Sequence, residues 1–207
     1  MHVFLDLDLT LVNIFPLWQN AWIDELARRL ELDPEHVFAV GARIWEQGGL
    51  YSLRAHLHEL FVDTQLPWVV ALQETFTARV RAGESNYDDT KVFLDTLAIV
   101  GCERSILTFG DQGYQTMKIE GLLRTPDFFH VVHFTKSPGE KANILAAHTR
   151  GWEPVVFIDD NPREHERVAL VAPHVRRIQI RRTDDIAITP HAHVVVSNLQ
   201  EAWEAIT

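Results

Sequence analysis

The chain has 207 residues, of which 46% are hydrophobic and 23% charged, a balance typical of a globular protein and not of a disordered or low-complexity one. At about 150 residues per domain, this length predicts one core with an insertion, because it is too short for two full domains. The formal charge of −10 argues against an extended nucleic-acid surface but leaves room for a local anion site.

Cysteine content and hydropathy indicate the cellular setting. Cys102 is the single cysteine, so we expect neither a disulfide framework nor a cysteine-based zinc cluster. The first ten residues include two acids and no basic leader, which argues against a signal peptide. No apolar stretch reaches the roughly 18 residues that a membrane-spanning helix needs. We therefore expect a cytoplasmic, soluble protein with no membrane partner.

Hydrophobic periodicity changes twice along the chain. Strict alternation over residues 3–11 predicts that a strand starts there, with polar residues toward its carboxyl end. Helical spacing follows over 15–87, and breaks at Asp33-Pro34, Gly48-Gly49, Pro67 and Gly83 predict about four helices and no strand. From residue 88, predicted helices and strands alternate. They are a helix at 88–100, a strand at 104–108, a helix through Met117 and Leu122, a strand at 129–134, a helix at 139–148, a strand at 155–158, a helix at 163–171, a strand at 175–180, and a last strand and helix after His193.

This alternation predicts an α/β fold with a doubly wound parallel sheet, whose active groups lie at the carboxyl ends of the strands. We assign residues 1–14 and 88–207 to a catalytic core with a Rossmann-like sheet. Residues 15–87 are then an α-helical insertion directly after the first strand.

Polar residues follow three of the predicted strands, where a buried strand has no structural need for them. In the predicted sheet these strand ends converge, and facing carboxylates repel unless they are protonated or bridged by a cation. An oxygen-rich, thiol-free cluster suits a hard divalent ion such as Mg²⁺, together with a substrate phosphate. The residues are Asp6, Asp8 and Thr10 after the first strand, Thr108 and Gly110 after the second, and Asp159 and Asp160 after the fourth.

These residue types suit phosphoryl chemistry. A carboxylate beside Mg²⁺ can attack phosphorus and form an aspartyl-phosphate, and a second acid two residues on can protonate the leaving oxygen and then activate water. A hydroxyl such as that of Thr108 can donate to a phosphoryl oxygen, and a lysine can neutralise the developing charge. Lys141, which opens the helix before the fourth strand, is suited to that last role.

Four segments resemble the ordered motifs of the haloacid dehalogenase (HAD) superfamily, and together they cover nearly the whole chain. Single motifs of this kind are weak signals, whereas the ordered set is specific. The segments are Phe4-Leu5-Asp6-Leu7-Asp8-Leu9-Thr10 for the first motif, Leu107-Thr108-Phe109-Gly110 for the second, Lys141 for the third, and Phe157-Ile158-Asp159-Asp160-Asn161 for the fourth.

The resemblance implies a role for each matching residue. Asp6 would be the nucleophile and a metal ligand, and Asp8 the general acid and base, ligating metal through its backbone carbonyl. Thr108, Gly110 and Lys141 would bind the substrate phosphate, with Lys141 also holding the nucleophile. Asp159 and Asp160 would complete the Mg²⁺ site. The dehalogenase branch lacks an acid at the position of Asp8, so the resemblance favours a phosphatase.

The helical insertion resembles the C1-type cap of this superfamily, which closes over the crevice and selects the substrate. Two features depart from the usual pattern. Lys136 competes with Lys141 for the third motif, although we favour Lys141 because the sequence after it reads as a helix start. The run 159–164 resembles a motif of capless relatives, which leaves the subfamily open.

Several of these residues also have purely structural interpretations. Asp159 and Asp160 can be turn or cap residues. We expect Asp111 and Asn161 to be turn residues or to support the metal ligands, and not to be ligands themselves. Thr108 can be an ordinary strand residue and Lys141 a solvated one. The tryptophans at helical spacing are expected in the core of the insertion, and the histidine pairs are not expected to bind zinc. A further hypothesis places four residues in the substrate cleft, namely Arg43, Trp45, Arg54 and His56.

The sequence thus predicts a Mg²⁺-dependent phosphohydrolase that cleaves a small phosphorylated metabolite through an aspartyl-phosphate. The alternatives are a HAD-fold binding or regulatory protein with weak catalysis, or another HAD reaction such as phosphomutase or dehalogenase chemistry. The substrate itself, the cap residues that select it and the oligomeric state are left open.

Overall fold

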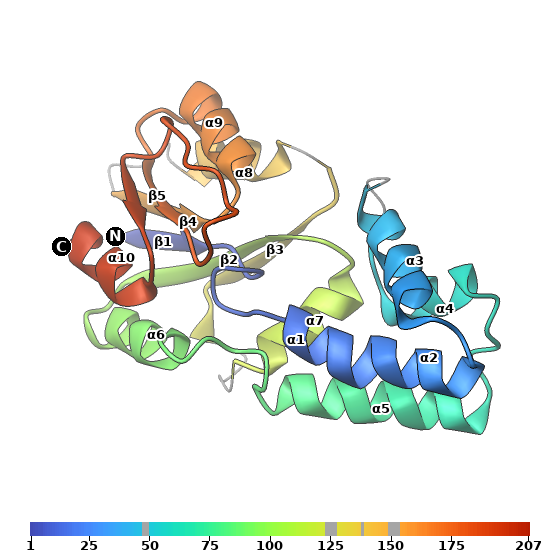
Figure 1. The fold of residues 1–207 in the computed structure, drawn as a ribbon. Coiled ribbons are helices and arrows are strands. Elements are labelled where there is room, and N and C mark those ends of the chain that lie inside the picture. Colours follow the sequence, from blue (N-terminus) through green and yellow to red (C-terminus); the bar gives the residue numbers. More distant parts are fainter. Residues whose placement is uncertain (47–49, 123–127, 138, 149–153) are drawn as a thin grey trace. The chain divides into compact units, whose positions relative to one another are not determined.

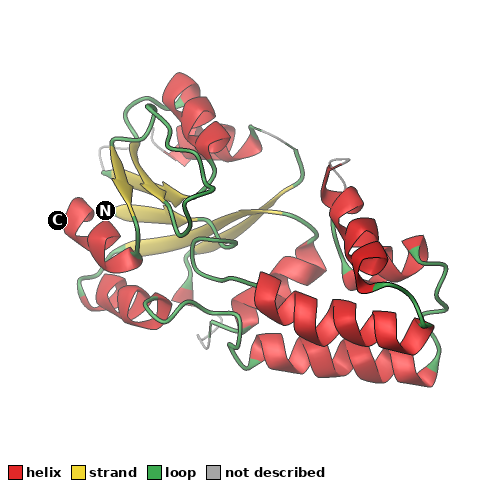
Figure 2. Ribbon diagram, viewed as in Figure 1, coloured by secondary structure: helices red, strands yellow, loops and turns green. Residues whose placement is uncertain are grey.

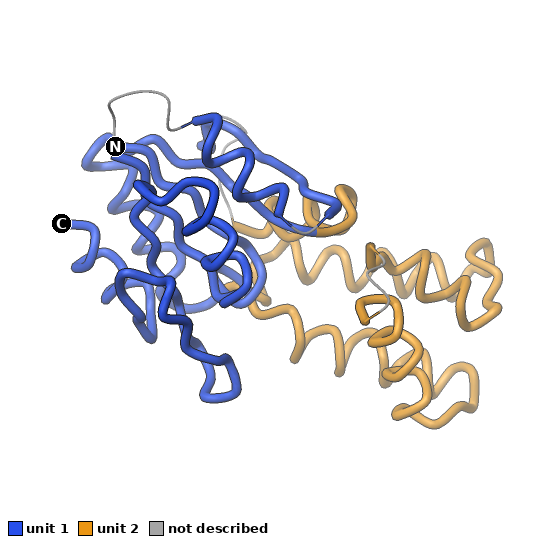
Figure 3. Tube along the Cα trace, turned by 90° about the horizontal axis from the view of Figure 1, so that it is seen from above, with its two compact units in different colours: residues 1–12, 87–109, 125–207 blue, residues 13–86, 110–124 orange. Residues whose placement is uncertain are grey.

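The computed structural model describes residues 1–46, 50–122, 128–137, 139–148 and 154–207 (Figure 1). The chain forms two compact units (Figure 3). The sheet unit comprises residues 1–12, 87–109 and 125–207, and the helical unit comprises residues 13–86 and 110–124.

The sheet unit contains a six-stranded parallel sheet of order β3-β2-β1-β4-β5-β6 (Figure 2). Successive strands run outward from β1 in one direction and from β4 in the other, so the topological switch point lies between these two strands. The predicted α/β, doubly wound parallel sheet is confirmed. The strands are β1 (His2–Leu5), β2 (Glu103–Phe109), β3 (Val131–Thr135), β4 (Val155–Asp159), β5 (Arg176–Ile180) and β6 (Val194–Val196).

In the described part of the sheet unit, helices α8 and α9 cover one face of the sheet and α6 and α10 the other (Figure 1). Phe4, Leu107 and Phe157 of the sheet form a buried cluster with apolar residues of α8 and α9 such as Leu145 and Val168. This burial fixes the helices that frame the carboxyl ends of β1 and β4. The helices are α6 (Thr90–Ile99), α8 (Glu140–His148), α9 (Pro162–Val171) and α10 (Leu199–Ile206).

The helical unit contains the predicted helices of the insertion, with no strand among the described residues of 15–87. The first three segments are consecutive, because a single π-helical turn joins α1 to α2. The predicted break at Gly48-Gly49 lies outside the described residues. None of the helices that the structure describes is long and apolar enough to cross a membrane. The segments are α1 (Phe15–Trp18), the π turn η1 (Gln19–Ile23), α2 (Asp24–Leu30), α3 (Pro34–Glu46), α4 (Leu53–Glu59), α5 (Pro67–Arg81) and α7 (Gln112–Glu120).

Helix α7 groups with the helical unit, although the sequence analysis assigned its residues to the core. Tyr114 and Met117 of α7 pack into the same buried apolar cluster as the helices of 15–87. Glu120, at its end, pairs with Arg81 of α5 at 2.5 Å. Helix α7 lies far from the insertion in the sequence, so only the tertiary packing reveals this association.

The core of the helical unit contains a buried polar network. Trp18 and Trp22 are fully buried, as predicted for tryptophans at helical spacing. His56 is also fully buried, which contradicts its proposed place in a substrate cleft. Its Nε2 donates to the Val37 carbonyl at 2.9 Å, so its Nδ1 is the acceptor for the Trp22 indole N–H at 3.1 Å and the Tyr51 hydroxyl at 3.0 Å. The network therefore requires a neutral imidazole.

We expect acid to destabilise the helical unit through His56. Burial lowers the pKa of His56 from 6.5 to about 4, against the opposing effect of the Val37 carbonyl. A lowered pKa means that the stabilisation is complete above pH 6.5 and is lost as the pH falls toward 4. The loss amounts to about 3 kcal/mol. Unfolding midpoints measured against pH test this expectation, and a His56→Gln variant should show a shallower dependence over this range. A slope equal to that of the unsubstituted protein would contradict it.

Candidate active site

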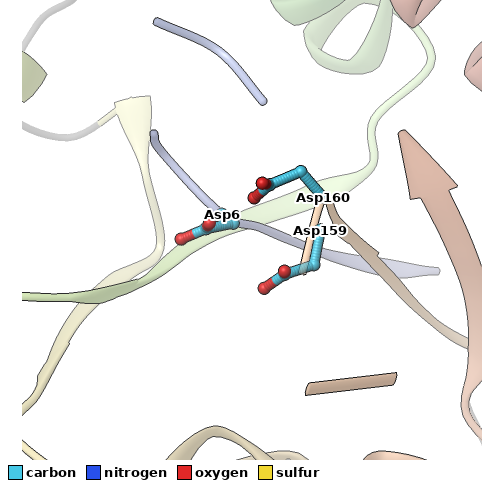
Figure 4. A group of neighbouring side chains, drawn as sticks. All are labelled: Asp6, Asp159 and Asp160. Carbon is cyan, nitrogen blue, oxygen red and sulfur yellow. The ribbon is translucent and has the colours of Figure 1, made fainter. Parts of the chain in front are cut away.

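Three carboxylates gather at the carboxyl ends of β1 and β4 (Figure 4). Asp6, Asp159 and Asp160 each offer an oxygen, and these oxygens all lie within 4.8 Å of one another. The sheet register explains this placement, because Leu5 pairs with Ile158 and the next residues along the two strands are therefore neighbours. The Asp6 amide accordingly donates to the Ile158 carbonyl at 2.9 Å. The acids extend in the same direction from the strand ends.

A buried lysine joins two of these acids. The Nζ atom of Lys141 lies 2.8 Å from Asp6 Oδ1 and 2.7 Å from Asp159 Oδ2. Lys141 is the second residue of α8 and is only 4% exposed, whereas Lys136 is exposed. Although burial opposes the charge of Lys141, the carboxylates of Asp159 and Asp6 raise its pKa above the usual value. Lys141 is therefore an ammonium group held between two carboxylates.

The acids outnumber the available positive charge. Burial raises the pKa of Asp6 to about 7 against the opposing charge of Lys141, and the charges of Asp159 and Asp8 add to the rise. Burial raises the pKa of Asp160 to about 9, with Asp159 and Asp6 adding to the effect. Burial likewise raises the pKa of Asp159. With all three carboxylates ionised and one lysine charged, two negative charges remain, and a divalent cation would neutralise them.

Buried donors fix the backbone that carries Asp159 and Asp160. His165 of α9 donates through Nε2 to the Asp159 carbonyl at 2.9 Å. Gln179 of β5 donates to the Asp160 carbonyl at 3.2 Å and to the Ala187 carbonyl at 2.7 Å. Neither donor is predicted from the sequence. Gln179 carried a signal, since it is a lone amide within the apolar end of a predicted strand.

The loop after β1 is a tight turn and not a continued strand. Leu9 adopts a positive φ of 54°, and the amides of Leu11 and Val12 both donate to the Leu7 carbonyl, at 2.9 and 3.0 Å. Asp8, which is half-buried in this turn, raises the pKa of Asp6 through its charge. The turn thus keeps the second acid near the first.

The second predicted motif is divided between the two units. Thr108 lies on β2 beside β1, where it is 1% exposed, and its Oγ1 has no hydrogen-bond partner in the described part of the chain. Gly110 belongs to the helical unit and has a φ of 148°, and a Cβ there would lie 2.7 Å from Gln115 Nε2. Asp111 caps α7 by accepting from the Tyr114 amide at 2.9 Å. Among these three residues, Thr108 is the one in the unit that carries the acids.

Asn161 caps a helix and also contacts one of the acids. Its side chain accepts from the Arg163 amide at 3.0 Å and caps α9, whose first residue is Pro162. Its own amide donates to Asp159 Oδ1 at 2.7 Å. The structure therefore brings together Asp6, Lys141, Asp159 and Asp160 by direct contact or close approach, with Asn161 at their edge.

Comparisons with known proteins identify the fold. No protein-family model matches this chain, and no curated protein matches it in sequence. A HAD phosphatase from Thermococcus onnurineus matches 99% of this chain with 97% of its own, at 20% identity and a TM-score of 0.67. YfnB of Bacillus subtilis, assigned as a HAD-hydrolase and bound to magnesium, matches 100% of this chain with 98% of its own, at 13% identity and a TM-score of 0.65.

Dehalogenases share the same architecture. L-2-haloacid dehalogenase from Xanthobacter autotrophicus, with chloropropionic acid covalently bound, matches 99% of this chain with 97% of its own, at 16% identity and a TM-score of 0.62. The chain therefore has the fold of the HAD-like hydrolases, as the ordered motifs predict. Because phosphatases and dehalogenases both have this fold, the choice between the two reactions depends on the residues of the site.

Proposed function

We propose that this protein is a Mg²⁺-dependent phosphohydrolase, which cleaves a small phosphorylated metabolite through an aspartyl-phosphate on Asp6. The observation that carries the proposal is the Lys141 ammonium between Asp6 and Asp159, with Asp160 close by. A fully buried lysine and three acids are costly to maintain for stability alone, because apolar residues would pack there at lower cost. Such perturbed groups are typical of functional sites.

The acid cluster fits Mg²⁺. Asp6, Asp159 and Asp160 supply hard oxygen donors. Burial is the main cause that raises their pKa values, and neighbouring carboxylates raise those of Asp6 and Asp160 further, so a bound cation would favour the ionised forms. When bound, Mg²⁺ would neutralise charge on these acids and on the phosphoryl oxygens. The magnesium in the structurally similar YfnB supports this assignment.

The residues of the chain divide the reaction into two displacements. An Asp6 oxygen forms a bond to phosphorus while the bond from phosphorus to the leaving oxygen breaks, and Asp8 gives its proton to that oxygen. Asp8 then takes a proton from water, whose oxygen bonds to phosphorus and frees Asp6. Lys141 holds Asp6 in place and offsets the phosphoryl charge, and the Thr108 hydroxyl donates to a phosphoryl oxygen.

Asp8 favours phosphate esters over organic halides. A halide ion is a weak base and leaves without a proton, whereas an alkoxide leaving group needs an acid. Asp8 supplies such an acid in the turn directly after Asp6. We assign substrate selection to the helical insertion, which occupies the position in the sequence where the resemblance implies a cap. We propose no nucleic-acid or membrane partner.

A phosphate-release screen tests this function. The panel comprises sugar phosphates, nucleotides and phosphoamino acids, each assayed with Mg²⁺ and after addition of a chelator. We expect at least one substrate to release phosphate with Mg²⁺ and to be inert with chelator. Metal-independent release, or halide release from a 2-haloacid without phosphatase activity, would contradict the proposal.

A further inference from the structure

Two of the chain segments that connect the units are joined by hydrogen bonds inside the sheet unit. The chain leaves the sheet unit after Val12 and returns to it at Tyr87. The Tyr87 amide donates to the Leu11 carbonyl at 3.2 Å, and the Thr90 hydroxyl donates to the same carbonyl at 2.6 Å. Tyr87 is therefore tied directly to the turn that follows Asp6 and contains Asp8.

Arg182, just after β5, clamps both segments. Its guanidinium lies 4.0 Å from the centre of the Tyr87 ring. The same group donates to both carboxylate oxygens of Asp89, at 2.7 and 2.9 Å, and to the Thr10 carbonyl at 2.8 Å. Asp89 is fixed in turn by the Leu199 amide at 2.8 Å. A bidentate pair and a stacked ring hold the Tyr87 side chain in one orientation.

The hydroxyl of Tyr87 is buried and has no hydrogen-bond partner among the residues that the structure describes, although Arg182 contacts the ring that carries it. Burial raises the pKa of Tyr87 against the opposing charge of Arg182, and the charges of Asp160, Asp89 and Asp8 add to the rise. The hydroxyl is thus protonated and can donate a hydrogen bond. The geometry that places Tyr87 beside the site is the hydrogen bond of its amide to Leu11 and the contact of its ring with Arg182, which also holds Thr10. Buried donors are nearly always paired in folded proteins, and an unpaired one needs an explanation.

We propose that the Tyr87 hydroxyl is a substrate-binding group of the site, which donates a hydrogen bond to an oxygen of the bound phosphoryl group. This inference rests on the proposed function, since it assigns a ligand to the same acids. Asp89 neutralises the charge of Arg182. The contact of Arg182 with Tyr87 therefore orients the tyrosine ring and adds little net positive charge for a ligand. The ligand must offer an acceptor, and the non-bridging oxygens of a phosphate ester do so. The site therefore holds phosphate through Tyr87 in addition to Thr108 and Lys141.

Removing this hydroxyl should affect stability and binding in opposite ways. In Tyr87→Phe the ring remains stacked on Arg182, and a buried donor that lacks a partner is lost. Its thermal midpoint should therefore be unchanged or raised. Its affinity for inorganic phosphate in saturating Mg²⁺, measured by calorimetry, should fall about tenfold or more, because a hydrogen bond to a charged oxygen is lost.

Tyr51→Phe is the matched control. The Tyr51 hydroxyl accepts from the Trp18 indole and contacts His56, so its loss should lower the thermal midpoint and leave phosphate affinity unchanged. Equal phosphate affinity in Tyr87→Phe and the unsubstituted protein, or a lowered midpoint without an affinity change, would overturn the role of Tyr87 alone. Absence of phosphate binding by the unsubstituted protein in Mg²⁺ would overturn both this role and the proposed function.

Discussion

Replacing Asp6 with asparagine is expected to lower kcat by a factor on the order of 10⁴ or more, while the protein stays folded. The amide cannot serve as the nucleophile, because its oxygen carries no full charge and its nitrogen lone pair is delocalised. Folding should tolerate the change. The raised pKa of Asp6, caused chiefly by burial, shows that the fold disfavours its ionised form, and Lys141 keeps its contact with Asp159 at 2.7 Å.

Phosphate release and denaturant unfolding, measured on the same preparations, check the Asp6→Asn expectation. Asp95→Asn is a suitable control, since Asp95 pairs with Lys91 on an exposed face of α6 at 2.9 Å, far along the chain from the acids. The control should retain normal turnover and stability. Near-normal hydrolysis by Asp6→Asn would rule out the aspartyl-phosphate mechanism.

The sequence was sufficient to predict the sheet and most of the acid cluster. Parallel strands have their carboxyl ends at the same edge of the sheet. The acids that follow the first and fourth strands therefore lie close to one another if these two strands are neighbours. The observed pairing of β1 with β4 meets this condition. Lys141 was also identified as a candidate, because it begins a helix that leads into β4.

Features that depend on tertiary packing were not predictable from local patterns. Alternating hydrophobicity continues past Leu5, although the strand ends there and a turn follows. Leu7 and Leu11 are buried in this turn as strand residues would be, so their pattern does not distinguish the turn from a strand. The association of α7 with the insertion depends on packing between distant segments. His56 resembled a cleft residue, since spacing alone does not distinguish an imidazole bound to two aromatic side chains in a core from one at a surface.

The interactions that orient the acids were hidden for a related reason. His165 and Gln179 donate hydrogen bonds to backbone carbonyls. Because every residue has such a carbonyl, no sequence motif identifies which residue accepts the bond. Arg182 likewise acts on Thr10 and Tyr87 from a position far away in the sequence. Polar residues within otherwise apolar elements are the one local sign of such contacts, and Gln179 is the example here.

Removing the charge of Lys141 is expected to have the largest effect on stability. In Lys141→Met the side chain keeps its approximate volume, but Asp6 and Asp159 lose the ammonium that contacts both of them. Breaking a buried ion pair from one side leaves uncompensated charge, and the free energy of unfolding should fall by about 3 kcal/mol or more. Turnover should be lost as well, since the ammonium group that holds the Asp6 side chain is removed.

Lys136→Met separates this effect from the general loss of a lysine. Lys136 is exposed, it is the other lysine that the sequence offered for the same role, and the substitution again exchanges an ammonium for a thioether. Denaturant unfolding and phosphate release should be nearly unchanged in that variant. If Lys136→Met lost activity while Lys141→Met kept it, the third-motif lysine would be Lys136, and the contacts of Lys141 with Asp6 and Asp159 would be structural only.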